Sequence, residues 1–284
     1  PARSSAPPEV SVAPTSAPTA PPPPTVSSPA TSASANGAIS RSISAGDRRY
    51  PELGSADIDV AHYDVSLTFD PDTYALTGTI DVRGTMTNAS DQIALDIAGP
   101  VVAAVSLPEG PVAHRVDGRE LVVELGKVHE KGEAFDVSIA FESVVPEDGD
   151  FLNRAGLFVG LEDRGVWAVN EPDGARTWLP VNDHPTDKAT WSFTITVPSD
   201  RTAIANGAFA GAIDGTVDGA AATTFAWRQD EPMAPYLITL AVGDYELRER
   251  VLPGDITAID AYPTSDVALA ERSYQQAREY AAER

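Results

Sequence analysis

Apolar and polar residues alternate with a period of two along most of the chain after residue 57. The segments HYDVSLTFD (62–70) and LTGTIDVRGTMTN (76–88) show this alternation clearly, and DPDTY predicts a turn between them. The pattern is typical of half-buried antiparallel strands. Further predicted strands are 92–98, 101–107, 120–126, 134–143, 190–198, 202–210, 223–229, 235–250 and 256–263. Residues 57–250 therefore indicate one large all-β unit.

The first part of the chain has no such pattern. Residues 1–46 consist mostly of Ala, Pro, Ser and Thr, with four consecutive prolines at Pro21–Pro24. A segment of this composition buries too little apolar area to offset its ordering entropy. The sequence predicts a disordered linker, locally of polyproline type. A tether through a cell envelope and a passive tail are both compatible with it.

The last part, residues 265–284, changes to helical spacing. Ser265 or Asp266 can cap a helix, and one stripe follows at helical spacing: Leu269, Ser273 or Tyr274, Ala277, and Tyr280 or Ala281. No Gly or Pro ends this helix. Because its apolar stripe has nothing after it to cover it, we expect the natural protein to continue beyond Arg284. The chain begins with Pro rather than Met, so we also expect that something upstream was removed.

Charge and composition exclude several classes of function. The chain has 20 Lys and Arg against 42 Asp and Glu, a formal net charge of −22. Such a surface repels nucleic acid and anionic lipid, so neither is an expected partner. The chain has no Cys, which excludes disulfides, thiolate metal sites and a Cys nucleophile. No apolar run reaches the length of a membrane span.

The residues most often used in catalysis give weak signals. The four histidines are His62, His114, His129 and His184, and no two have metal-ligand spacing. His129-Glu130 resembles the start of His-Glu-x-x-His, but the fifth residue is Glu133, and Gly132 favours a turn. No Gly-x-Ser-x-Gly elbow and no Gly-rich phosphate loop is present. The four tryptophans could line a sugar site, although a place in the core is favoured in a β-rich chain.

The segment NEPDGARTWLPVNDHPTDKATW (170–191) is the main candidate for function. We interpret it as a shaped loop between two strands, with residues 176–179 extended before Pro180 and with capping side chains at 182–184. Glu171 follows a strand and precedes Pro172, so its carboxylate projects from a rigid base. A carboxylate there suits the binding of an ammonium group. An ion pair with Arg176 is an equally good interpretation of the residues alone.

The same segment carries a resemblance. EPDGARTWLPVNDHPTDKATWSFTITVP resembles the corresponding segment of the M1 zinc aminopeptidases, the aminopeptidase N family. Four further pieces occur in the same order: YDVSLTFDP with LTGTIDV, GEAFDVSIAF with AGLF, ANGAF, and APYLITLAVGDYE. The resemblance covers residues 57–284.

The resemblance implies a mainly β fold. Residues 47–250 would form a large antiparallel, saddle-like or sandwich domain, preceded by the disordered linker. Residues 251–284 would be the truncated beginning of a thermolysin-like α/β catalytic domain. Glu171 matches the family's acidic residue that binds the free α-amine of the substrate, and Asn170 is a second candidate for substrate binding. Asp183, Pro185 and Lys188 match the motif as scaffold of the loop, whereas Val169 replaces a Gln found in some members.

The family's catalytic motifs are absent from this chain. Neither Gly-x-Met-Glu-Asn nor His-Glu-x-x-His occurs before Arg284. The resemblance therefore implies Zn²⁺ in a full-length parent but no zinc and no hydrolysis in this chain. The implied partners are peptides with a free amino terminus and the protein's own catalytic domain.

Sequence reasoning thus predicts the amino-terminal portion of an exported bacterial zinc aminopeptidase, located outside the cell or in the envelope. The parent would remove amino-terminal residues from peptides. A non-catalytic envelope β-sandwich that binds carbohydrate or acts as an adhesin is the alternative from another class. A family member with a degenerate zinc site, kept for protein contacts, is a third hypothesis.

Overall fold

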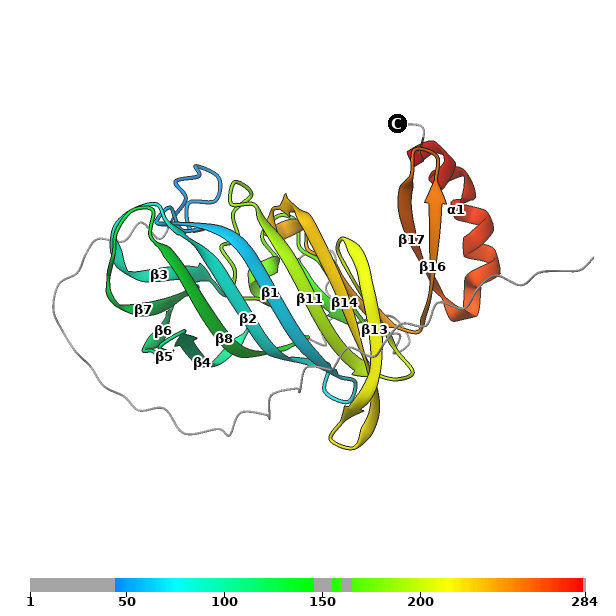
Figure 1. Ribbon diagram of the computed structural model, residues 1–284, viewed down its shortest axis with the longest axis horizontal. Helices are drawn as coiled ribbons and strands as arrows, with labels where there is room; N and C mark the ends of the chain where they lie inside the picture. The colour runs from blue at the N-terminus through cyan, green and yellow to red at the C-terminus, as the bar shows by residue number, and fades with distance from the viewer. Residues whose placement is uncertain (1–43, 146–154, 160–164, 283–284) are drawn as a thin grey trace, which may run out of the picture. The chain divides into compact units, whose positions relative to one another are not determined.

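The structure is a computed structural model that describes residues 44–145, 155–159 and 165–282. The predicted disordered linker, 1–46, lies outside the described residues except for its last three positions. Most of the described residues belong to strands, and α1 (Val267–Ala282) is the one α-helix among them, so the prediction of a mainly β fold is confirmed (Figure 1).

The largest sheet has eight strands in the order β13-β14-β11-β1-β2-β8-β4-β5 (Figure 1). Their bounds are β1 (Ile58–Asp70), β2 (Ala75–Met86), β4 (Val101–Leu107), β5 (Gly110–Pro111), β8 (Ala134–Val144), β11 (Ala189–Pro198), β13 (Ala208–Val217) and β14 (Ala220–Met233). All neighbours pair antiparallel except β1 and β11, which are parallel. The prediction of antiparallel strands is wrong at this pair, where residues 71–188 supply the long crossover that parallel strands need.

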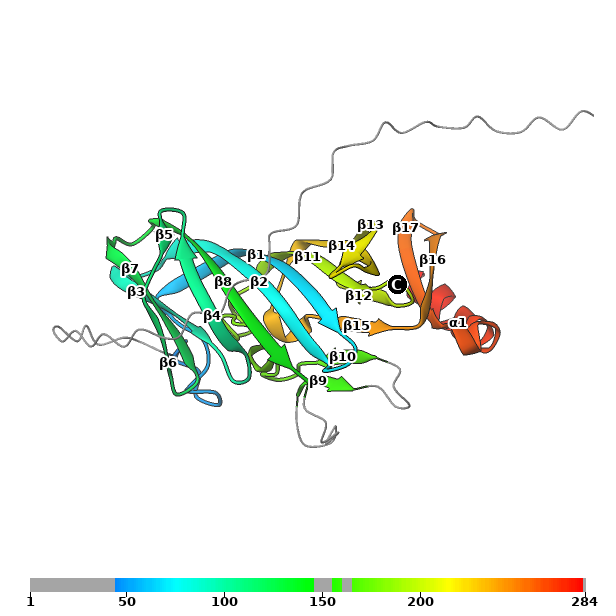
Figure 2. The same cartoon turned by 90° about the horizontal axis from the view of Figure 1, so that it is seen from below.

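Two smaller sheets accompany the large one (Figure 2). The first consists of β12 (Thr202–Ala205), β15 (Leu240–Gly243), β10 (Val166–Val169) and β9 (Gly156–Val159). The second consists of β3 (Ser90–Asp96), β7 (Glu120–His129) and β6 (His114–Asp117). All three sheets contribute to one continuous apolar cluster that includes Ile80, Leu95, Leu121 and Val242, each at most 1% exposed. The sheets therefore share one core.

The tryptophans belong mostly to this core. Trp178, Trp191 and Trp227 are at most 3% exposed, and Trp191 stacks on Tyr63 with the ring centroids 4.1 Å apart. Trp167 is half-buried and stacks on Phe158 at 5.0 Å. The core interpretation is confirmed for the three buried rings, which have no face to offer a sugar.

Two predicted strands are interrupted. The segment 202–210 divides into β12 and β13 at Gly207, whose φ of +87° is a conformation that glycine tolerates best. The segment 235–250 divides into the 3₁₀ turn η3 (Pro235–Leu237), β15 and β16 (Tyr245–Leu252). Pro235 cannot donate a backbone hydrogen bond to a sheet, which favours a turn at that end.

A hairpin and a helix complete the chain. β16 pairs with β17 (Ile256–Pro263), and the turn η4 (Thr264–Asp266) leads into α1 (Val267–Ala282), so the predicted helix is confirmed. Arg248, Arg250 and Arg278 all lie within 3.4 Å of the Glu271 carboxylate and tie α1 to the hairpin. Leu269 and Tyr274 remain more than half exposed. The predicted boundary after residue 250 falls inside β16. No described helix is both long and apolar enough to cross a membrane.

Candidate amine-binding loop

The loop that carries Glu171 joins the four-stranded sheet to the large sheet. β10 ends at Val169, and the turn after it is closed by the Gly174 N–H, which donates to the Asn170 carbonyl at 2.6 Å. The 3₁₀ turn η2 (Ala175–Thr177) follows, and the loop reaches β11 at Ala189. The prediction that 176–179 is extended is therefore wrong. A β-carbon at Gly174 would lie 2.6 Å from the Gly156 nitrogen, so glycine permits this tight packing against β9.

Backbone hydrogen bonds fasten the loop to the end of β3. The Asp96 N–H donates to the Val181 carbonyl at 2.7 Å, and the Val181 N–H returns a bond of 3.2 Å. The Ala98 N–H donates to the Arg176 carbonyl at 2.8 Å. One isolated β-bridge, between Asp96 and Val181, and one further backbone bond thus attach the loop to the end of β3.

Glu171 lies at the exposed side of this loop. Its side chain is exposed, and within the described part of the chain no hydrogen bond or ion pair reaches its carboxylate. Arg176 instead pairs with Asp173, with 2.6 Å between the guanidinium Nη2 and the carboxylate Oδ2. The structure does not show the ion pair between Glu171 and Arg176. The carboxylate of Glu171 is consequently available to a cation from outside.

Asn170 has a different environment from Glu171. It is 2% exposed, and its amide Nδ2 donates to the Ile238 carbonyl at 2.6 Å. Its Oδ1 accepts a hydrogen bond of 2.9 Å from the Trp178 indole N–H. Both ends of the amide therefore serve the protein itself, and the predicted contact of Asn170 with substrate stays a prediction.

A buried cluster of carboxylates lies beneath the loop. Asp96 accepts hydrogen bonds from the N–H groups of Gly54 and Asp183, and Asp183 accepts one from the Arg176 N–H at 3.0 Å. Asp183 thus belongs to the scaffold of the loop, whereas Pro185 and Lys188 are exposed.

Sequence reasoning missed two members of this cluster, Asp96 and its register partner Glu120. Nothing local marks them, because they come from distant strands.

A second group of polar contacts fixes the end of the loop. Asn182 accepts a hydrogen bond of 2.6 Å from the Ser55 N–H, and its amide donates to the carboxylate of Asp187. Asp187 in turn accepts from the Val60 N–H at 3.1 Å, and the Tyr63 hydroxyl accepts from the Asn182 N–H. The loop is therefore tied to β1 and to the segment before it.

Burial changes the acidity of these groups. Desolvation, reinforced by the nearby charge of Asp96 and partly offset by Arg176, raises the pKa of Glu120 to about 8. Desolvation also raises the pKa of Asp183 to about 7 and that of Asp187 to about 6. These carboxyls ionise near pH 4 in an unfolded chain, so between pH 4 and pH 8 the folded chain holds extra protons. Their contribution to stability is present below pH 4 and declines as pH rises through these values.

We expect the folded chain to lose stability between pH 5 and pH 8, and Asp183→Asn to lose less than the wild type. The substitution removes one of the titrating groups while its amide oxygen can still accept the hydrogen bond from Arg176. Melting temperatures measured across this range compare the two curves. Glu109→Gln, at an exposed turn, is the matched control. Parallel curves for Asp183→Asn and the wild type would show that Asp183 does not titrate there.

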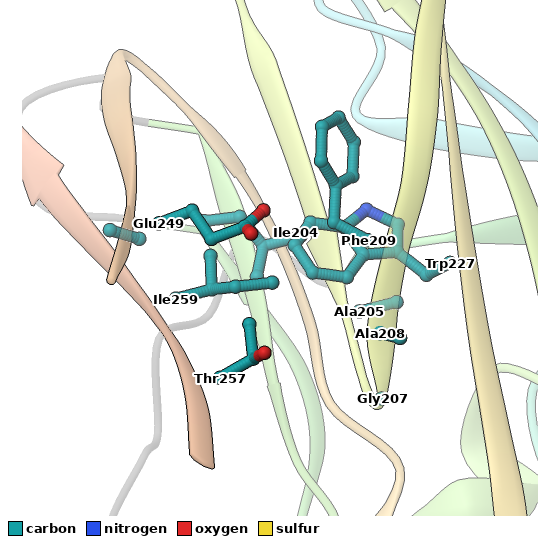
Figure 3. A pocket seen from close by; sticks show the side chains of 10 residues that line it. Ile204, Ala205, Gly207, Ala208, Phe209, Trp227, Glu249, Thr257 and Ile259 are labelled. Carbon is teal, nitrogen blue, oxygen red and sulfur yellow. The ribbon is translucent and has the colours of Figure 1, made fainter. Parts of the chain in front are cut away.

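A cavity of about 550 Å³ lies elsewhere, between the strands β12–β14 and the hairpin (Figure 3). Figure 3 shows Glu249 and Ile259 of the hairpin facing Ile204 and Trp227 across it. Its other lining residues are Ala205, Gly207, Ala208, Phe209, Thr257 and Ala261. None of them belongs to the loop 170–188, so this cavity does not contribute to a site at Glu171.

The described residues do not fit a zinc site. Among residues 44–145, 155–159 and 165–282, no three His, Asp or Glu side chains are grouped as metal ligands. The zinc that the resemblance implies therefore has no ligand set in this part of the chain, and no catalytic step through a metal follows from it.

Comparison with known proteins decides the family. Residues 60–237 match the family model described as the peptidase M1 N-terminal domain. This chain belongs to the M1 peptidase family. Among curated relatives, Aminopeptidase Q of Acinonyx jubatus is 26% identical over 243 residues, covering 74% of this chain and 24% of that protein. Aminopeptidase Q of Felis catus is 29% identical over 185 residues, covering 61% and 18%.

Solved M1 structures agree with this assignment. An M1 zinc metallopeptidase of Deinococcus radiodurans, in a mutant form bound to a Tyr-Ser-Ala substrate, has a TM-score of 0.68 and 30% identity. A two-domain M1 zinc metallopeptidase mutant bound to L-arginine gives the same two values. Each comparison covers 78% of this chain and 51% of the other. The chain spans about half the length of these structures and a quarter or less of the curated relatives. It carries the N-terminal domain of M1 aminopeptidases.

Proposed function

We propose that this chain is the amino-terminal part of an exported, zinc-dependent aminopeptidase that removes amino-terminal residues from peptides. The observation that carries the proposal is the free carboxylate of Glu171 on the M1 N-terminal domain. It projects from a loop that is fastened to two sheets, and no described residue neutralises it. The solved relatives bound to Tyr-Ser-Ala and to L-arginine, both of which carry an α-amine, support this class of substrate.

The chemistry of Glu171 would select the end of a peptide. An α-ammonium group donates up to three hydrogen bonds and carries a full positive charge, and an ionised carboxylate only accepts. A peptide bond in the middle of a chain has no such cation. A fixed carboxylate at this position therefore favours substrates with a free amino terminus, and it sets how deeply the peptide enters the site.

Export is part of the proposal, and it is supported by composition. Residues 1–46 combine Ala, Pro, Ser and Thr in the manner of an envelope spacer. Fractionation of the native cells checks this part. The proposal predicts the protein in the envelope or the medium, and recovery from the cytoplasm would contradict it.

The carbohydrate-binding alternative has less support. Sugar sites of β-rich proteins need exposed aromatic faces, whereas Trp178, Trp191 and Trp227 are buried. The half-buried Trp167 already stacks on Phe158. A family member with a degenerate zinc site differs from the proposed enzyme only outside the described residues, so a metal measurement must separate them.

The protein encoded by the complete gene is expected to contain one zinc per chain and to cleave aminoacyl anilides. A chelator should abolish the cleavage, and added Zn²⁺ should restore it, because the solved relatives are zinc metallopeptidases. Metal content and cleavage rates measured on the same preparations provide the test. A protein without zinc, or one whose cleavage survives complete zinc removal, would contradict the proposed function.

A further inference from the structure

Asn170 connects three separate parts of the chain. It follows β10, its Nδ2 donates to the carbonyl of Ile238 beyond η3, and its Oδ1 accepts from the indole of Trp178 beyond η2. Both partner residues are at most 2% exposed. The backbone carbonyl of Asn170 also closes the next turn by accepting from Gly174. One buried residue therefore makes three hydrogen bonds, two within its own loop and one to the segment after η3.

These bonds restrain the residue that follows. Glu171 is bonded covalently to Asn170 and belongs to the turn that the Asn170 carbonyl closes, but no described residue holds its carboxylate. The position of that carboxylate therefore depends on the backbone beneath it. Hydrogen bonds buried away from water keep their geometry, because breaking one leaves an unsatisfied polar group.

We propose that Asn170 is a positioning residue of the amine site, whose buried amide clamps the end of β10 so that the Glu171 carboxylate is held where it meets the substrate ammonium. This inference rests on the proposed function and deepens it. It gives Asn170 an indirect role in place of direct contact with substrate, because its amide is buried and each end bonds to the protein.

The chemistry of this position requires an amide. The clamp needs a donor toward the Ile238 carbonyl and an acceptor toward the Trp178 indole on one short side chain. An ionised Asp would accept from the indole but place a charge against the carbonyl oxygen. Leu would fill a similar volume and make neither bond. Trp178→Phe removes the indole donor and keeps one aromatic ring, although it also loses the volume of the second ring at a buried position.

The test is a double-mutant cycle between positions 170 and 171 in the protein encoded by the complete gene. We expect Asn170→Ala to lower kcat/KM for a free-amine dipeptide anilide about tenfold, mostly through KM. In a Glu171→Ala background the same change should cost less than about twofold, because the carboxylate to be positioned is gone. Trp178→Phe, which removes one of the two bonds of the Asn170 amide, should show the same dependence on Glu171 on a smaller scale.

Trp227→Phe is the matched control. Trp227 is a buried residue of β14, outside the amine-binding loop, and its indole N–H donates to the Ala203 carbonyl at 3.0 Å, so the substitution removes one buried hydrogen bond away from Glu171. It should lower the melting temperature comparably without raising KM for the free-amine substrate. If the role of Asn170 were purely structural, Asn170→Ala and the control variant would change the melting temperature and KM in the same way.

The outcomes separate the two proposals. If Glu171→Ala alone changes neither cleavage nor the affinity for a free-amine dipeptide, the proposed role of Glu171 fails. Suppose that Glu171→Ala weakens both cleavage and affinity. The positioning role alone then fails if Asn170→Ala and Trp178→Phe leave cleavage and affinity unchanged. It also fails if they lower them equally in the wild type and in the Glu171→Ala background. A wild-type protein that neither cleaves nor binds the dipeptide overturns both.

Discussion

Replacing Glu171 by Ala is expected to lower kcat/KM for peptides with a free amino terminus by about 30- to 1,000-fold. The carboxylate is exposed in this chain, and the proposal implies that the bound peptide and the rest of the enzyme exclude water from it. A hydrogen-bonded charge pair shielded in that way contributes on the order of 2–4 kcal/mol, and each 1.4 kcal/mol is a factor of ten. Zinc content should not change, because the described part of this chain supplies no ligand set. Steady-state kinetics on the protein from the complete gene measure the effect.

Two further variants make the interpretation specific. Glu171→Gln keeps the size and one acceptor oxygen but loses the charge, so it should fall between wild type and Glu171→Ala. Glu109→Gln removes an exposed carboxylate from the turn between β4 and β5 and should cost less than twofold. Equal losses in Glu109→Gln and Glu171→Gln would mean that overall negative charge, rather than one fixed carboxylate, attracts the substrate.

Trp191→Ala is expected to lower the free energy of unfolding by about 3–5 kcal/mol. Trp191 is fully buried at the parallel pairing of β11 with β1, where it stacks on its register partner Tyr63. Its indole N–H also donates to the Met233 carbonyl at 3.2 Å, so the substitution leaves a cavity and loses a hydrogen bond. Urea unfolding of this chain, followed by circular dichroism, measures the change.

Trp191→Phe and Trp167→Ala are the controls. Phe retains an aromatic ring against Tyr63 and should recover most of the loss, apart from about 1 kcal/mol for the hydrogen bond. Trp167 is only half-buried, so its removal should cost less than that of Trp191. If Trp191→Ala were as stable as the wild type, the shared core between the sheets would be wrong.

Sequence patterns predicted most strands because burial in this fold follows the two-residue period. In β1 the buried residues Tyr63, Val65 and Leu67 occupy every second position. The same pattern does not reveal pairing partners. The parallel pairing of β1 with β11 depends on how distant segments close the core, which no local period encodes. Gly207 and Pro235 can be seen in the sequence, but whether each one interrupts a strand depends on the contacts around it.

The candidate site divides in a similar way. The position of Glu171 between a strand and a proline was visible in the sequence, and the resemblance gave it a role. The sequence left two partners open for the Glu171 carboxylate, an external cation and Arg176. Only the coordinates show that Arg176 pairs with Asp173 instead. Asp96 lies about 90 residues before Asp183 in the sequence and accepts a hydrogen bond from it only in the fold. Glu120 joins the group as the register partner of Asp96 on the neighbouring strand. The clamp formed by Asn170 also joins segments that are distant in sequence.

The measurement that tests the central claim most directly compares one substrate with and without its amine. The ratio of kcat/KM for a free-amine dipeptide anilide to that for its N-acetylated form is measured for wild type and Glu171→Gln. The account predicts a large ratio in the wild type that collapses toward one in the variant, because only the carboxylate distinguishes the two substrates. A ratio unchanged by the substitution would contradict the assignment of Glu171 as the residue that binds the substrate amine.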